Sequence, residues 1–226
     1  MSVIVRSARI TGTSSKFAGR ARKQWCSVMV VALLALGLAA CGKEKPVHYF
    51  QLTHPPTTEI SATQTPIDAA VLVRLFQTSH LYREDRIVYG NDSVEIGLYE
   101  TNRWTEPPID LLQGALARGL RSSHQFRAVT TLRSEANVVD YELMGQLYAY
   151  REVSTGNGAR ARLNFDVELM DAKKGKVMWR YSYDHDEPSA GNTVADLATA
   201  MDKNVHQAVQ QVQDGIVQAI NEYTRK

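Results

Sequence analysis

The sequence predicts an α+β fold, in which a mostly antiparallel sheet is covered by one medium helix and one long C-terminal helix. Two observations predict this fold class. Three segments in the second half of the chain alternate apolar and polar residues with a period of two, which is typical of antiparallel strands buried on one face. Two other segments repeat apolar residues every three or four positions, which is typical of helices packed on a sheet.

The three alternating segments predict a C-terminal three-stranded meander. They are residues 141–149, 161–169 and 177–183. The connections between them, 154–158 and 171–175, contain the turn residues Gly, Asn and Asp, as short links between antiparallel strands do. Shorter apolar runs predict further strands at residues 71–76, 86–89 and 94–99.

Two helices complete the predicted domain. Pro107 and Pro108 are expected to open the first, because proline is tolerated in the first turn of a helix. The second is expected to begin near Thr193, with Asp196 three residues later as a capping partner. Its apolar stripe continues for about 30 residues, or roughly 45 Å of helix.

This helix is longer than an ordinary strand, since five or six residues of strand span about 17–20 Å. We therefore expect its C-terminal end to extend beyond the sheet and to contact a partner protein or a second copy of the chain. The residues concerned are Ile216, Ile220 and Tyr223. Exposed apolar patches usually mark interaction sites.

The first 40 residues are interpreted as a lipoprotein signal peptide. Basic residues occur up to Lys23 without any acidic residue, and an apolar stretch follows at 28–38. This stretch is shorter than the roughly 20 residues that span a bilayer. The junction Leu38-Ala39-Ala40-Cys41 resembles a bacterial lipobox, which implies that Cys41 is acylated, with palmitate as a typical chain, and that a membrane is a partner. A plain signal peptide that ends near a cysteine is the alternative.

The residue after the lipid site indicates the membrane. Gly42 stands where an Asp would resemble the inner-membrane retention signal of enterobacterial lipoproteins, so we expect the periplasmic face of the outer membrane. Residues 41–70 are rich in Pro, Thr and Gln and predict the lipid anchor followed by an extended tether. Within this tether, apolar residues at 48–52 could add an edge strand. The folded domain is expected at 71–226.

Charge and motifs exclude several functions. The signal peptide carries six of the 26 basic residues and none of the 24 acidic ones, so the remainder has a net charge near −4. A nucleic-acid partner is not expected, because such proteins carry basic patches. With Cys26 in the signal and Cys41 acylated, the domain has no cysteine for catalysis or for a disulfide.

No catalytic residue, cofactor or metal site is predicted. The sequence lacks the glycine-rich, serine-elbow and zinc-binding motifs of common enzymes. Asp184-His185-Asp186-Glu187 is the one cluster that suggests a metal, but we interpret it as a solvated loop where a strand ends. The chain is therefore expected not to be an enzyme.

Several short motifs, in this order after the lipobox, resemble the ABC-type transport auxiliary lipoprotein family across residues 47–226. They are Tyr49–Leu52, Arg86–Tyr89, Arg103–Pro108, Asp140–Leu143 and Gly175–Trp179, followed by the long final helix. The family includes the lipoprotein of the paraquat-inducible intermembrane transport system.

The resemblance implies a role beside an ATP-driven transporter. In such systems a periplasmic substrate-binding-type (MCE) subunit moves lipids or other hydrophobic molecules between membranes, and the lipoprotein would be its outer-membrane docking partner. Trp104 and Pro107 are candidate partner contacts, although they could instead fasten the helix onto the sheet. A pilot lipoprotein of outer-membrane assembly or secretion, and a degenerate periplasmic hydrolase, remain alternatives.

Overall fold

A computed structural model describes residues 45–53, 66–91, 94–132, 135, 138–156 and 158–225. The predicted signal peptide and Cys41 lie outside the described residues. From Pro46 onward the chain forms one compact unit. Among the described residues, neither helix combines the length and the apolar character that crossing a bilayer requires.

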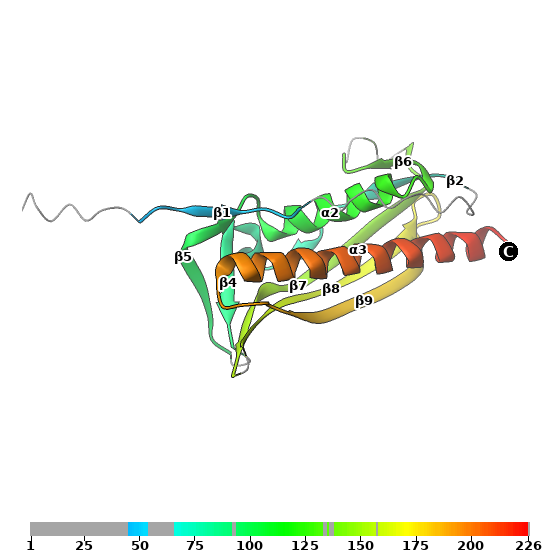
Figure 1. The fold of residues 1–226 in the computed structure, drawn as a ribbon. Coiled ribbons are helices and arrows are strands. Elements are labelled where there is room, and N and C mark those ends of the chain that lie inside the picture. The colour runs from blue at the N-terminus through cyan, green and yellow to red at the C-terminus, as the bar shows by residue number, and fades with distance from the viewer. Residues whose placement is uncertain are drawn as a thin grey trace, which may run out of the picture. The chain divides into compact units, whose positions relative to one another are not determined.

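Nine strands form a single sheet, and two helices lie along one face of it (Figure 1). In chain order the elements are β1 (His48–Phe50), β2 (Ile67–Val73), β3 (Gln77–Thr78), the 3₁₀-helix η1 (His80–Arg83), β4 (Arg86–Gly90), β5 (Ile96–Trp104), α2 (Pro108–Ser122), β6 (Phe126–Thr130), β7 (Tyr141–Thr155), β8 (Gly158–Asp171), β9 (Lys176–Pro188) and α3 (Val194–Thr224).

The predicted meander is confirmed. Strands β7, β8 and β9 pair antiparallel over nearly their full lengths. Side chains on alternate positions of β8, such as Leu163 and Phe165, are fully buried. The two connections contain Gly158 (φ 117°) and Gly175 (φ 62°), in the left-handed region where glycine avoids the steric cost of a side chain.

The sheet is mixed, however, and the prediction of a mostly antiparallel sheet was wrong. One edge of β7 pairs with β8, whereas the other edge pairs in parallel with β2, β3 and β4 in succession. β1 with β5 and β2 with β6 are also parallel pairs. Alternation along a strand shows which face is buried and says nothing of the direction of the neighbouring strand. Consistent with this, the parallel-paired β2 is buried on both faces from Ala69 to Val73.

Both predicted helices are confirmed, with their predicted starts. Pro108 is the first residue of α2, and its missing N–H costs nothing there. At the start of α3, the backbone N–H of Asp196 donates to the hydroxyl of Thr193 at 3.1 Å. The carboxylate of Asp196 in turn accepts from the Thr193 backbone N–H at 3.2 Å, which completes a capping box.

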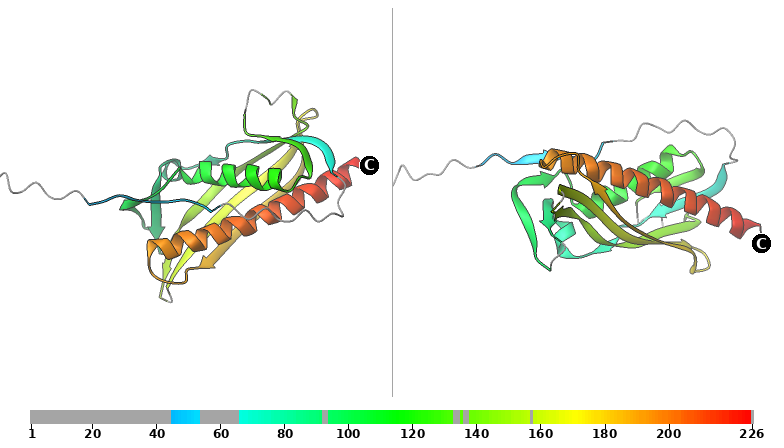
Figure 2. Two further views of the ribbon diagram at one scale, coloured as in Figure 1. Left: turned by 45° about the horizontal axis from the view of Figure 1, so that its top comes forward. Right: turned by 60° about the horizontal axis from the view of Figure 1, so that its bottom comes forward.

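Helix α3 matches the length of the strands that it covers. Its 31 residues span about 46 Å, and the 13 to 15 residues of the meander strands span roughly 43–50 Å. The helix packs along β8 and β9 (Figure 2). Ile216 and Ile220 are consequently buried, so the expectation that this end extends beyond the sheet was wrong. The cause is that the strands are more than twice the length assumed.

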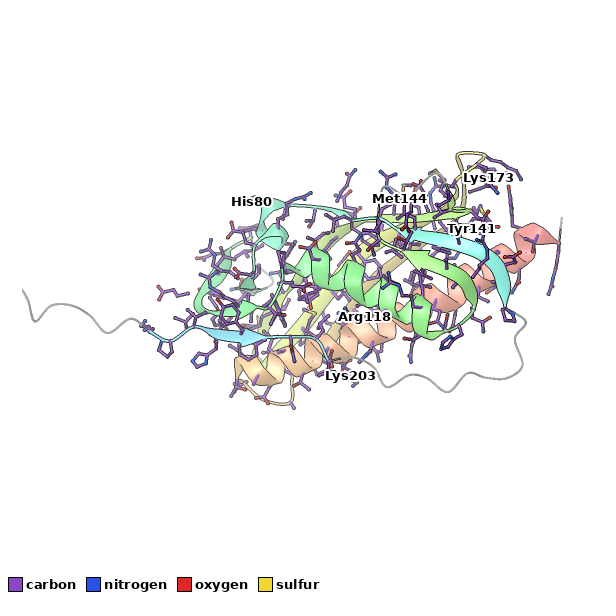
Figure 3. All side chains as sticks on the ribbon, turned by 90° about the horizontal axis from the view of Figure 1, so that it is seen from above. His80, Arg118, Tyr141, Met144, Lys173 and Lys203 are labelled. Carbon is purple, nitrogen blue, oxygen red and sulfur yellow. The ribbon has the colours of Figure 1, made fainter. Side chains whose placement is uncertain are left out.

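The N-terminal segment joins the domain earlier than predicted. β1 pairs in parallel with residues 102–104 of β5, and the backbone N–H of Thr105 donates to the carbonyl of Phe50 at 2.8 Å. Beyond β1, Leu52 is buried, and the Thr53 N–H donates to Asp202 of α3 at 2.8 Å. This end of the segment lies near Arg118 of α2 and Lys203 of α3 (Figure 3). The edge strand suggested for 48–52 is therefore present, within the region interpreted as a tether.

One buried polar side chain ties α3 to the sheet. The amide nitrogen of Asn204 donates to the carbonyls of Ala161 on β8 (2.8 Å) and His185 on β9 (3.0 Å). Its amide oxygen accepts from the Tyr183 hydroxyl at 2.6 Å. All the polar atoms of this buried side chain are thus used, which is what makes its burial tolerable.

We predict that Asn204→Ala lowers the free energy of unfolding by about 3 kcal/mol, because the carbonyls of Ala161 and His185 lose their donor and the Tyr183 hydroxyl keeps only the backbone carbonyl of residue 204, at 3.2 Å. Urea unfolding followed by circular dichroism measures the change. Gln210→Ala removes the same kind of amide from an exposed position of α3 and is the matched control, with a change within about 0.5 kcal/mol. Equal effects of the two variants would contradict the role given to Asn204.

Candidate functional site

The face of the meander opposite α2 and α3 is lined by polar and charged side chains. Cross-strand ion pairs join Arg162 to Asp184 (3.1 Å) and Arg180 to Glu168 (2.6 Å). These residues alternate along β8 and β9 with the buried side chains that face α3. An antiparallel meander of this kind can leave one face in contact with water, so this surface is available for binding.

A hollow of about 340 Å³ lies on this helix-free face. Two apolar side chains on its wall are unusually exposed: Leu75 at 46% and Tyr148 at 48%. Arg74, Met144 and Asp166 are among the other lining residues. We refer to this surface as the Leu75–Tyr148 hollow.

The hollow forms where the sheet is interrupted. β2 ends at Val73, and the chain pairs with β7 again only at Gln77 as β3. Opposite the gap stands Gly145, where a Cβ atom would lie 2.2 Å from the carbonyl oxygen of Asp166 and 2.8 Å from the ring of Phe76. Glycine at this position therefore leaves room for the side chain of Phe76 to enter the core from the gap. The centroids of the Phe76 and Phe165 rings are 6.0 Å apart.

Hydrogen bonds hold the rim of the hollow in place. The Tyr148 hydroxyl donates to Asp166 at 2.9 Å, and Arg74 pairs with Glu142 at 3.0 Å. The hydrogen bond to Asp166 raises the pKa of Tyr148, so its hydroxyl stays protonated. Exposed apolar side chains beside ordered polar groups are typical of protein-binding surfaces, where tyrosine is enriched.

The structure does not bring the predicted partner contacts together. Trp104 is buried, with its ring 5.3 Å from that of Tyr150 in an edge-to-face arrangement, and Pro107 directly precedes α2. Ile216 and Ile220 are core residues of α3. Tyr223 is half-buried, and its hydroxyl bonds to Asp171 at 3.2 Å and to Lys174 at 2.9 Å. The indole of Trp104 is thus part of the core, which leaves it unavailable as a surface contact in this structure.

Sequence reasoning missed Leu75 and Tyr148. A signal was present for Tyr148: the polar face of the predicted strand 141–149 carries Met144 and Tyr148, two large side chains on the face expected to meet solvent. No comparable signal exists for Leu75. Its exposure follows from the gap between β2 and β3, which only the pairing along β7 reveals.

The acidic cluster at residues 184–187 lies within β9, so its interpretation as a loop was wrong. Glu187 is buried and forms an ion pair with Lys203 of α3 and a hydrogen bond with His185 Nε2, the latter at 3.2 Å. Within the described part of the chain, no group of three or more His, Cys, Asp or Glu residues could hold a metal ion. Burial alone would raise the pKa of Glu187, but the hydrogen bonds from Lys203 and His185 outweigh it and lower this pKa.

The lowered pKa of Glu187 predicts a loss of stability in acid. The carboxylate stabilises the fold above its unfolded-state pKa of 4.5, and this contribution disappears as the pH falls through the lower folded-state value. We expect Glu187→Gln to be less stable than the natural chain at pH 7, and the difference to shrink below about pH 4. Urea unfolding at pH 7, 5, 4 and 3 measures it.

Glu168→Gln, which removes an exposed carboxylate from the opposite face of β8, controls for the general effect of losing one negative charge. A Glu187→Gln difference that stays constant from pH 7 to pH 3 would show that the ion pair and the hydrogen bond of Glu187 do not stabilise the fold.

The fold is an α+β domain with one helix-covered face and one open polar face that carries the Leu75–Tyr148 hollow. The model of the family described as ABC-type transport auxiliary lipoprotein component matches residues 50–213. The chain belongs to this family, which confirms the resemblance seen in the sequence. No curated protein matches the chain.

Two solved structures share the fold. Protein XCC0632 from Xanthomonas campestris is 17% identical with a TM-score of 0.71, and the match covers 79% of this chain and all of that one. An uncharacterized protein is 13% identical with a TM-score of 0.60, covering 76% of this chain and 99% of its own. A weaker match is the PelC dodecamer from Paraburkholderia phytofirmans, which is 14% identical with a TM-score of 0.40 and covers 65% and 88% of the two chains.

Proposed function

We propose that this lipoprotein is held at the periplasmic face of the outer membrane by lipid on Cys41. There it docks the periplasmic MCE-type subunit of an ABC transporter that moves lipids or other hydrophobic molecules between the two membranes. Membership of the transport auxiliary family is the observation that carries the proposal. Docking of this kind requires no catalytic group on the lipoprotein.

The Leu75–Tyr148 hollow is the proposed docking surface. It combines two exposed apolar side chains with a rim of charged residues that are already ordered by ion pairs and hydrogen bonds. A rim ordered in advance costs little side-chain entropy when the partner binds. The covered face of the sheet is occupied by α2 and α3, so the open face supports docking better.

The lipid anchor is tested at Cys41. Cys41→Ser should abolish labelling with radioactive palmitate and release the protein from the membrane fraction, because only the thiol of this position stands at the lipobox junction. Cys26→Ser is the matched control, since Cys26 lies within the signal and should leave labelling unchanged. Density-gradient separation of the two membranes tests the outer-membrane location. Persistent labelling of Cys41→Ser would refute the anchor.

Docking is tested by placing a charge in the hollow. Leu75→Glu should weaken binding of the purified MCE-type subunit by about tenfold or more, because a carboxylate would replace an apolar contact at the centre of the interface. Surface titration or calorimetry measures the affinity. Tyr148→Ala should act in the same direction.

Leu132→Glu is the matched control for this test, because Leu132 is similarly exposed, at 57%, and is not part of the hollow. Both leucine variants should unfold within about 0.5 kcal/mol of the natural chain, as exposed substitutions do. Equal binding by Leu75→Glu and the natural chain would place the docking surface elsewhere.

A further inference from the structure

The edge strand β1 presents apolar side chains to its surroundings. Tyr49 is 62% exposed, and Val47, two residues earlier and just before β1, is 44% exposed. The neighbouring Phe50 packs against the core beside Trp104, its partner on β5. Since successive side chains of a strand point to opposite faces, Tyr49 points away from the core.

Tyr49 is the first residue of a row that crosses three strands. It stands opposite Arg103 on β5, which stands opposite Arg86 on β4, so the three side chains share one face of the sheet. The two arginines pair with Asp85 and Glu84, each at 2.6 Å. The two carboxylates neutralise the two arginines, so this surface combines an aromatic ring with ion pairs and has no net charge. Tyrosine beside arginine is typical of side chains at the boundary between a membrane and water.

The covalent chain keeps this row close to the lipid site. Seven residues lie between Cys41 and Tyr49, so the Cα atoms of these two residues, eight positions apart, are at most about 29 Å from each other. β1 itself is held by its pairing with β5, by the Thr105–Phe50 hydrogen bond and by the bond between Thr53 and Asp202. β1 is therefore the first described element after the predicted lipid site and lies within a short covalent distance of it.

We propose that the β1 edge lies against the lipid headgroups, with Val47 and Tyr49 in the interfacial layer of the bilayer. This inference rests on the lipid anchor at Cys41 in the proposed function. The acyl chains supply the binding energy, and the aromatic contact orients the domain. Such a contact restricts rotation about the anchor. The remaining surfaces of the domain then keep a constant orientation relative to the membrane.

A single cysteine with an environment-sensitive NBD label tests the contact in the lipidated protein. The mature chain has no cysteine besides the acylated Cys41, so Tyr49→Cys accepts the label at one place. Val138→Cys is the matched control, because Val138 is 71% exposed and lies just before β7. β4, which carries Arg86 of the same row as Tyr49, pairs with the opposite end of β7, about 34 Å along that strand. Each protein is reconstituted into phosphatidylethanolamine–phosphatidylglycerol vesicles with or without doxyl-labelled lipid.

The label at position 49 should shift to shorter wavelength on vesicles and be quenched at least about twofold more than the label at 138, as expected for a side chain in the interface. Mass spectrometry of Cys41 and flotation of the vesicles report the anchor independently. If the acylated protein floats but position 49 is not quenched, or both positions are quenched equally, the β1 contact is refuted and the anchor stands. Absence of acyl mass on Cys41 would refute both.

Discussion

The packing of α3 along the meander is the constraint on which the rest of the structure depends. A helix of 31 residues and strands of 13 to 15 residues have nearly the same length, so one apolar stripe is buried from end to end. Asn204 of α3 donates hydrogen bonds to carbonyls of both β8 and β9. Near the same end of the helix, Lys203 donates to Glu187 of β9. Together they define where along the strands the helix lies.

Because α2 and α3 cover one face of the sheet, the other face of the meander is available for the proposed docking. Because α3 and α2 supply the core, the outward side chains of β7, β8 and β9 are free to be polar and to form ion pairs across the strands. The interruption between β2 and β3 adds the Leu75–Tyr148 hollow to this open face. In the proposed function, binding and folding thus use opposite faces of the same strands.

The attachment of β1 defines where the N-terminal segment joins the domain. Because β1 pairs with β5 and the segment after it bonds to α3, the chain between Cys41 and the domain is short. A short connection limits both the distance and the orientation that the domain can adopt, whereas a free tether of 30 residues would limit neither. In the proposed docking function, a constant orientation would reduce the entropy lost on binding.

The sequence by itself determined the local structure of the domain. The alternation in 161–169, the prolines before α2 and the capping pair of Thr193 with Asp196 depend on neighbours within a few positions, so pattern and propensity were sufficient for the meander and both helices. The lipobox at Cys41 is also a local motif, and it remains a prediction because it lies outside the described residues. Family membership could be recognised from the order of short motifs.

Only the tertiary structure decided how the strands pair and which apolar residues meet water. Parallel pairing of β2, β3 and β4 with β7 joins residues about 60 to 70 positions apart, and no local pattern carries that information. The antiparallel pairing of β7, β8 and β9 over 13 to 15 residues made these strands long enough for α3 to bury Ile216 and Ile220. The interruption between β2 and β3 left Leu75 exposed beside Gly145. Exposure is a property of the whole packed sheet, so the proposed docking surface could not be found from the stripe of one helix.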